Sequence, residues 1–203
     1  MNPKFSRRKS DSKYRLDSFP YTQSVFHKVG TGWIPDVKQL VSRAREEVLS
    51  FQNIYQVQMP PKQLAERLGM FIQAYTLYSS VRPFGASPIM ACMEGTTPHL
   101  YMFETSGAYY GYKACAAGKA KQLAKTEMEK LDLDNLSMTQ LAKEAARIIY
   151  TVHDNSKDSI FELELAWICP ESNYVFSRVP KELFDEAVQY AEGADDDMDD
   201  EDL

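Results

Sequence analysis

The segment of the chain that most resembles a catalytic or ligand-binding loop is residues 111–120, Gly-Tyr-Lys-Ala-Cys-Ala-Ala-Gly-Lys-Ala. A phosphate-binding loop places four residues between its glycines and a Ser or Thr after its lysine, where the hydroxyl holds Mg²⁺. Here six residues separate Gly111 from Gly118, and Ala120 follows Lys119. We therefore expect these glycines to permit tight packing between a strand and a helix rather than to bind a nucleotide.

Side chains that could bind a metal are scattered. The histidines show neither H-x-x-x-H nor H-E-x-x-H spacing, and the cysteines form no C-x-x-C pair. These residues are His27, His99, His153, Cys92, Cys115 and Cys169. The sequence thus predicts no metal site, no disulfide framework and no cofactor, and it fits a reducing compartment.

Candidates for acid-base or nucleophilic catalysis are equally weak. The chain has no G-x-S-x-G nucleophile elbow. Glu162 and Glu164 alternate with apolar residues, so they share one strand face, which we expect to be exposed rather than part of a pocket. From the residues alone, we predict a protein without an active site.

Composition indicates one ordinary globular domain, because 203 residues with 44% hydrophobic and 26% charged content can bury a core. No apolar run approaches the roughly 20 residues of a membrane helix, so we expect no membrane partner. The first residues are charged rather than apolar, which argues against a signal peptide.

Both ends of the chain carry runs of like charge. The segment 1–16 contains six bases and one acid, and the segment 194–203 contains seven acids and no base. Such runs favour solvated, mobile ends. Arg7-Arg8-Lys9 could be a nuclear-import or nucleic-acid patch, but we favour a simple solvated end and predict no nucleic-acid partner. The acidic tail is interpreted either as a docking segment for basic partners or as a solvated end.

Apolar periodicity predicts the helices. One is expected over 36–51, with Asp36 and Gln39 forming a capping box, and a second begins at Pro61 and carries an apolar stripe to Tyr78. Two more are expected over 119–131 and 138–152, the latter with a capping box formed by Ser137 and Gln140, and a last helix follows Pro180. The stripe of Phe71, Tyr75 and Tyr78 is expected to pack on a sheet.

Between the helices, short segments predict strands. They are expected over 89–93, 100–104, 108–114, 161–167 and 174–178. The strictly alternating segment 161–167 is the clearest of them, whereas Pro88 is discordant because proline cannot donate to a ladder. Helix pairs that alternate with hairpins favour antiparallel sheet covered by helices, an α+β protein.

A family resemblance enters with the segment 75–85, which ends in Arg82-Pro83-Phe84-Gly85. This segment resembles the signature of 20S proteasome alpha subunits, in which the second helix ends at an R-P-F-G turn that feeds a strand. The resemblance covers roughly residues 30–203 and is most similar to the alpha type-3 group. It continues through 111–120, 124–131, 148–154 and 161–167 and ends in the acidic tail.

The resemblance implies a four-layer αββα sandwich, the N-terminal nucleophile hydrolase fold, with Arg82, Pro83, Phe84, Gly85, Gly111, Gly118 and Lys119 as structural signature residues. It also implies a non-catalytic subunit in a seven-membered alpha ring. Such a subunit contacts other alpha subunits, the beta ring and regulatory caps, and contributes to core-particle assembly and ubiquitin-dependent protein degradation. The implied location is cytoplasm and nucleus.

The family's gate segment and first strand pair are not recognisable in residues 1–29. We therefore divide the chain into a divergent basic segment (1–29), a proteasome alpha-type domain (30–193) and an acidic tail (194–203), and expect a fold that lacks the first helix and strand pair. Exposed apolar surface and open sheet edges should follow.

Two alternatives to an assembled alpha-ring subunit stay open. One is a truncated variant that does not assemble, and the other is a free-standing threonine hydrolase of the same fold, which would need a processed N-terminal Thr31.

Overall fold

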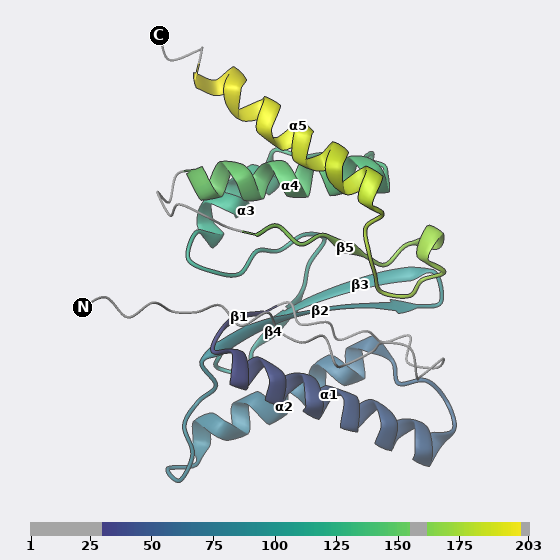
Figure 1. Ribbon diagram of the computed structural model, residues 1–203. Coiled ribbons are helices and arrows are strands. Elements are labelled where there is room, and N and C mark those ends of the chain that lie inside the picture. The colour runs from purple at the N-terminus through teal and green to yellow at the C-terminus, as the bar shows by residue number, and fades with distance from the viewer. Residues whose placement is uncertain (1–29, 155–161, 200–203) are drawn as a thin grey trace, which may run out of the picture.

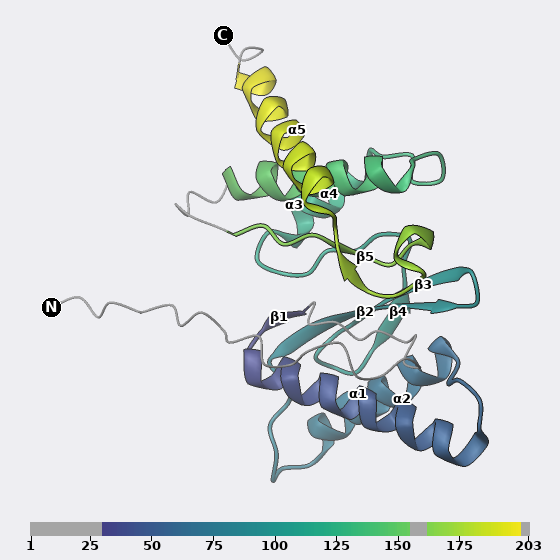
Figure 2. The same ribbon diagram turned by 45° about the vertical axis from the view of Figure 1, so that its right-hand side comes forward.

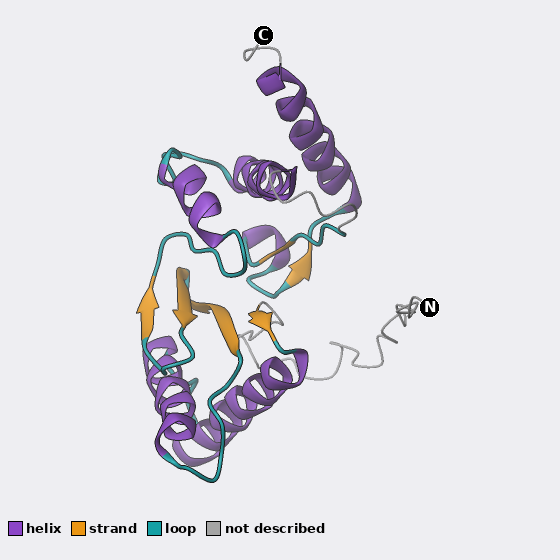
Figure 3. Cartoon of the chain, turned by 90° about the vertical axis from the view of Figure 1, so that its left-hand side faces the viewer, coloured by secondary structure: helices purple, strands orange, loops and turns teal. Residues whose placement is uncertain are grey.

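The computed structural model describes residues 30–154 and 162–199. Its elements lie in four layers: a helix pair, a four-stranded sheet, a two-stranded sheet and a group of three helices (Figure 1). The side view shows both sheets between the two helical layers (Figure 3). This arrangement confirms the expected α+β class and the expected αββα layering.

The first helical layer consists of α1 (Ile34–Tyr55) and α2 (Pro61–Leu77). Helix α2 begins at Pro61 as predicted, because a proline lacks only an N–H that the first turn leaves free. It ends at Leu77, so the expectation that Tyr78 packs with the helix stripe is wrong, and Tyr78 is 66% exposed.

The main sheet lies on this helix pair. Its strands are β1 (Gly30–Gly32), β2 (Ala86–Glu94), β3 (Thr97–Phe103) and β4 (Tyr109–Gly111), all antiparallel and in this spatial order. The two-residue turn at 95–96 joins β2 to β3. The predicted meander is confirmed.

Pro88 fits this sheet because of its place in the register. It lies opposite Gly30 of β1, and the pairing of β2 with β3 begins one residue later, at Ile89 opposite Met102. The missing N–H of Pro88 therefore falls ahead of the β3 ladder.

A large hydrophobic core fills the space between the sheet and the helix pair. Alternate residues of β2 are buried against the helices. The buried members of this first cluster include Leu40, Ala44, Leu64, Leu68, Ile72, Met90, Cys92 and Phe103. Each is no more than 2% exposed, so these side chains are shielded from solvent.

The second half of the chain forms the other two layers. Helices α3 (Lys121–Glu129), α4 (Met138–Asp154) and α5 (Lys181–Asp199) cover the small sheet of β5 (Ala166–Trp167) and β6 (Ser177–Arg178). Helix α5 crosses over α4 and extends away from the body (Figure 2). It continues past residue 193, so part of the acidic tail is helical.

Helix α4 begins where its local sequence signal predicts. The predicted capping box of α4 is confirmed, since the Gln140 side-chain oxygen accepts from the Ser137 N–H at 2.9 Å and the Gln140 backbone N–H donates to the Ser137 hydroxyl at 3.3 Å.

No helix in the described part of the chain is long and apolar enough to cross a membrane.

A second, smaller hydrophobic cluster lies in the second half of the chain, whose helices α3, α4 and α5 we call the upper helices. Ala146 of α4 and Ala187 and Ala191 of α5 are fully buried, and Leu163 and Leu165 pack against them. This cluster shares no residue with the first one. Small side chains at the crossing let the two helix backbones approach closely.

A charged network joins the three upper helices. Glu127 of α3 is buried and accepts from Lys130 at 2.6 Å and from Arg147 of α4 at 3.5 Å. Arg147 also donates to Glu144 at 2.8 Å, and the Tyr190 hydroxyl of α5 donates to the same carboxylate at 2.7 Å. Glu127 is therefore buried with its charge paired, as burial of an ion requires.

The prediction of a full strand over 161–167 is wrong. Residue 161 lies outside the described residues, 162–165 carry no strand pairing, and only Ala166 and Trp167 form a ladder. The alternation was interpreted correctly, because Glu162 and Glu164 are exposed while Leu163 and Leu165 are half-buried. A strand also needs a hydrogen-bonded neighbour, and the described residues supply none beside 162–165.

Candidate functional site

The R-P-F-G turn is fixed by an ion pair to the first helix. Arg82 donates from Nη1 to Asp36 Oδ2 at 2.7 Å and from Nη2 to Asp36 Oδ1 at 2.8 Å. The Gly85 N–H donates to Asp36 Oδ2 at 2.8 Å, and Arg82 Nη1 also donates to the Pro83 carbonyl at 2.9 Å. One carboxylate thus holds both ends of the turn.

Asp36 was predicted to cap a helix, and that prediction is wrong. Helix α1 begins at Ile34 after Trp33, so Asp36 lies inside its first turn and makes no cap hydrogen bond. Its side chain is buried and serves the turn instead. The Arg82 guanidinium, together with the Gly85 N–H, lowers the pKa of Asp36 below its ordinary value.

Trp33 completes the contact between the turn and the chain ahead of α1. The Arg82 guanidinium lies 4.6 Å from the centre of the Trp33 ring, a cation–π contact. The Trp33 N–H donates to the Gly85 carbonyl at 2.9 Å. Neighbouring Gly32 has φ +110°, and a Cβ there would lie 2.1 Å from the Gly85 oxygen. Only glycine fits this close approach.

Phe84 anchors the turn in the first hydrophobic cluster. It is 6% exposed, and its ring lies 4.5 Å from that of Tyr75 and 5.8 Å from that of Phe71. The guanidinium of Arg43 covers the Phe71 ring at 5.1 Å. Phe71 and Tyr75 are partly buried and pack against the first hydrophobic cluster, as core side chains rather than a ligand site.

A groove of about 420 Å³ opens beside this turn. Pro35 and Gln39 of α1, Tyr75 of α2, and Val81 and Arg82 line it. Large apolar side chains surround the same end of the helix pair, with Trp33 62% and Ile34 69% exposed. Exposed apolar side chains therefore lie beside the R-P-F-G turn.

The other signature residues lie elsewhere. Gly118 has φ +130°, and a Cβ there would contact the Thr31 methyl of β1 at 3.4 Å. Gly111 ends the edge strand β4 opposite Tyr101, and Lys119 is exposed ahead of α3. Gly118 therefore lies near Thr31 of β1, the residue that precedes Gly32. Gly111 lies in β4, at the opposite edge of the main sheet.

The candidate nucleophiles and ligands are dispersed. Thr31 lies in the middle of β1 opposite Ser87, and Thr96 lies in the β2–β3 turn. His99 lies in β3 and His153 in the last turn of α4, while His27 lies outside the described residues. Within 30–154 and 162–199, no group of three or more His, Cys, Asp or Glu side chains is placed to hold a metal ion.

Sequence reasoning missed Asp36 and Trp33 as parts of the site. Their roles depend on Arg82, which is 46 residues from Asp36, and no short-range spacing rule reports such a pair. The available signal was the acid at position 36, one helical turn before Leu40, because a charge on the apolar face of a helix needs a partner.

The chain is similar to several curated proteins. It is 48% identical over 164 residues to the proteasome subunit alpha type-3 of Acanthamoeba castellanii, with 81% of this chain and 65% of that protein covered. It is 45% identical to a probable proteasome subunit alpha type-7 of Schizosaccharomyces pombe, covering 79% and 64%. For the alpha type-3 subunit of Oryza sativa subsp. japonica, the identity is 44% and the coverage 83% and 68%.

This chain spans about two-thirds of the length of these relatives. The family model for proteasome subunits matches residues 27–168, which include the helix pair, the main sheet and the R-P-F-G turn. That match covers more than half of the chain. The chain therefore belongs to the proteasome subunit family.

Proposed function

We propose that this chain is a non-catalytic structural subunit of the 20S proteasome alpha ring. It contributes to core-particle assembly and to ubiquitin-dependent protein degradation, in the cytoplasm and the nucleus. The observation that carries the proposal is the identity of 40–48% to proteins named proteasome subunit alpha type-3, over most of this chain. The partners of such a subunit are other alpha subunits in a seven-membered ring, beta-ring subunits and regulatory caps.

The exposed side chains beside the Arg82 turn support a role in assembly. Trp33, Ile34, Tyr78 and Val81 are all more than 40% exposed, and Arg82 stacks on the first of them. Tryptophan, tyrosine and arginine are the residue types that contribute most to protein–protein interfaces. A subunit that buries this surface in a larger particle would gain the free energy of apolar burial.

The geometry of Thr31 disfavours the alternative of a threonine hydrolase. A catalytic threonine of that class uses its own free α-amine as the base. Here Thr31 lies within β1, with Gly30 paired to Pro88 before it and Gly32 paired to Ala86 after it. Cleavage ahead of Thr31 would cut the edge strand of the main sheet. An intact-mass measurement on the protein from its native cells tests this, because processing would remove the first 30 residues.

Affinity purification from native cells tests the main proposal. The tagged chain is purified, run on a native gel and analysed by mass spectrometry. We expect the other alpha and beta subunits to be recovered at the size of the core particle. Recovery of the chain alone, or with chaperones only, would overturn the proposal and favour the alternative of a truncated variant that does not assemble.

A variant sharpens this experiment. Replacing Tyr78 with Asp adds a charge to the exposed surface but disturbs no hydrophobic cluster, so folding should be kept while recovery of partners falls. A matched control is Tyr112→Asp, which changes another exposed tyrosine, on the chain beyond β4. Equal loss with both variants would argue against the surface beside the Arg82 turn.

A further inference from the structure

The connection between β5 and β6 carries a tyrosine at a backbone position that favours glycine. The Val175 N–H donates to the Ser172 carbonyl at 3.0 Å, which closes a four-residue turn. Both central residues have positive φ, +53° at Asn173 and +58° at Tyr174. This is the pattern of a type I′ turn, for which Asn-Gly is the preferred sequence. Asn173 suits its position, whereas the backbone of a bulky residue such as Tyr174 is strained there.

Hydrogen bonds hold this strained backbone in place. The Cys169 carbonyl accepts from the Tyr174 N–H at 2.9 Å and from the Ser172 N–H at 3.1 Å. The Ser172 hydroxyl donates to the same carbonyl at 3.0 Å and accepts from the Cys169 N–H at 3.1 Å. Cys169 is 2% exposed, so these bonds tie the turn to a buried residue. The positive φ of Tyr174 is therefore imposed by its surroundings.

Packing within the described chain does not account for the tyrosine. Tyr174 is half-buried, but it is not among the described side chains that pack against either hydrophobic cluster. Its hydroxyl forms no hydrogen bond with another described residue, and the neighbouring Val175 is 50% exposed. The short helix over 170–172, which precedes the turn, lies at the edge of the molecule in both views (Figure 1, Figure 2). A strained, surface tyrosine without an internal partner has the properties of a protein contact residue.

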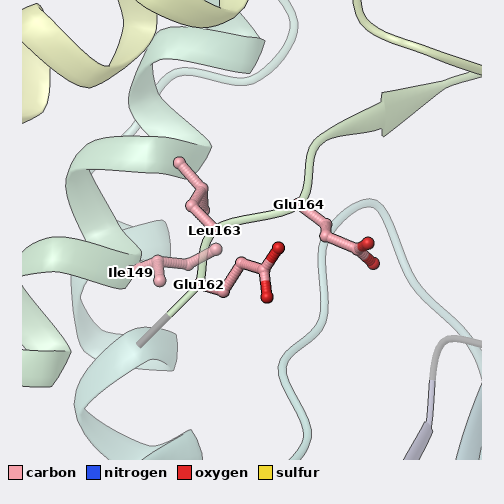
Figure 4. Close-up of a pocket in the computed structure, with 4 residues that line it drawn as sticks. All are labelled: Ile149, Glu162, Leu163 and Glu164. Carbon is pink, nitrogen blue, oxygen red and sulfur yellow. The ribbon is translucent and has the colours of Figure 1, made fainter. Parts of the chain in front are cut away.

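The charge beside the turn defines the surface that would complement it. Glu171, three residues before Tyr174, is exposed and forms no ion pair with another described residue. The nearest base along the chain, Arg178, already pairs with Glu164 at 3.1 Å, and the Glu164 carboxylate points away from α4 (Figure 4). The segment 169–177 contains one acid and no base. A complementary surface would therefore place a basic side chain and an apolar one against this turn.

We propose that Tyr174 is a contact residue for a neighbouring subunit of the core particle. The neighbour presents a lysine or arginine to Glu171 and an apolar side chain to the Tyr174 ring. The choice of partner rests on the proposed function, because the subunits of the particle supply the second surface. Binding takes the ring out of water and gives Glu171 an opposite charge, so the contact offsets the strain that the turn carries in the free chain.

Replacing Tyr174 with glycine separates strain from contact. Tyr174→Gly removes both the ring and the strain, so the melting temperature of the purified chain should rise by about 2–4 °C. Recovery of alpha and beta subunits by affinity purification from native cells should fall at least about fivefold, because the contact residue is lost. Tyr174→Phe keeps the ring and the backbone strain, so it should change neither value.

Gln56→Gly is the matched control. Gln56 also has a positive φ, +56°, and is exposed at the end of α1, where glycine is favoured. This variant should raise the melting temperature in the same way and leave the recovery of subunits unchanged. An equal loss of recovery with Gln56→Gly and Tyr174→Gly would overturn the proposal, because relief of strain alone would then account for both.

The remaining outcomes separate this proposal from the proposed function. Unchanged recovery with Tyr174→Gly would overturn the contact and leave the proposed function intact. A lower melting temperature for Tyr174→Gly would also overturn it, because the ring would then stabilise the free chain. If the unmodified chain recovers no alpha or beta subunit, the proposed function fails and the contact fails with it.

Cross-linking identifies the second surface directly. A photo-reactive phenylalanine analogue is placed at position 174, and the purified particle is irradiated and analysed by mass spectrometry. We expect residue 174 to be joined to another subunit, at a peptide that contains Lys or Arg beside an apolar residue. Cross-links to this chain alone would contradict the proposal.

Discussion

Asp36 and Arg82 form a two-point ion pair that joins the first turn of α1 to the R-P-F-G turn, with oxygen–nitrogen distances of 2.7 and 2.8 Å. The Asp36 side chain is 8% exposed and that of Arg82 is 55% exposed. The two members of the ion pair therefore differ in their exposure to solvent. Loss of the acid removes the partner of two groups, Arg82 and the Gly85 N–H, whereas loss of the arginine leaves the acid its hydrogen bond from Gly85.

We expect Asp36→Ala to destabilise the chain by about 2 kcal/mol, because it leaves the Gly85 N–H and the Arg82 guanidinium without their acceptor. Arg82→Ala should destabilise it less. Urea denaturation of the purified variants, followed by circular dichroism, measures both free energies of unfolding. Lys38→Ala is the control on the same helix, since Lys38 is exposed, and it should leave the free energy nearly unchanged. A larger loss for Arg82→Ala than for Asp36→Ala would contradict this account of the turn.

Gly32→Ala should lower the free energy of unfolding more than Asp36→Ala does, by at least about 3 kcal/mol. The added Cβ would lie 2.1 Å from the Gly85 carbonyl oxygen, and the backbone has φ +110°, where only glycine is unstrained. Thermal denaturation of the variant checks this. Gly193→Ala is the matched control, because a Cβ at this position meets nothing within 4 Å. Gly193 lies in α5, where alanine is a better helix former than glycine. That control should be neutral or stabilising.

Stability should fall in acid because two carboxyls are held ionised in the folded chain. The pKa of Asp36 is lowered by Arg82 and then by the Gly85 N–H, and the pKa of Glu127 is lowered by Lys130 and then by Arg147. Their stabilisation is complete above the ordinary values of 3.8 and 4.5, and it is lost as the pH falls through the lower folded values.

Melting temperatures measured from pH 7 down to pH 3 test that expectation. The unmodified chain should hold its melting temperature near neutral pH and lose it progressively below about pH 4.5. Asp36→Asn should start from a lower melting temperature and show a shallower acid dependence, because the Asp36 contribution is absent at every pH. An acid dependence in Asp36→Asn as steep as in the unmodified chain would show that other carboxyls dominate.

The thiols should be slow to react while the chain is folded. Burial raises the pKa of Cys92 to about 12 and that of Cys115 to about 11, and the pKa of Cys169 is also raised, chiefly by burial. At pH 7.5, fewer than about one in a thousand molecules carry a thiolate at Cys92 or Cys115. We expect iodoacetamide to modify Cys92 at least about a hundredfold more slowly in the folded chain than in urea, as followed by mass spectrometry. Equal rates would place Cys92 outside the first cluster.

Much of the fold could be predicted from local pattern. The start of α2 at Pro61 and the capping box at Ser137 depend on neighbours within a few positions, and both are confirmed. Asp36 shows where such reasoning fails. The spacing of Asp36 and Gln39 matches a capping box, but Arg82 is a stronger partner that becomes available only in the folded chain.

The segment 161–167 fails for a related reason. Its alternation predicts correctly which side chains face the upper helices, since that depends on the segment itself, yet pairing depends on a second segment. Tyr78 continues the rhythm of the α2 stripe, but the helix ends one residue earlier. Periodicity therefore indicates which residues could share a face, and the turn that follows decides how far the helix runs.

The separation of the two hydrophobic clusters has a consequence for synthesis on the ribosome. The first cluster takes all its buried residues from Val37 to Phe103, and the second takes its buried residues from Ala146 to Ala191. The helix pair and main sheet can therefore complete their core while the rest of the chain is still being translated. Only the upper half must wait for the last helix, so a stalled or shortened nascent chain leaves its small cluster without α5.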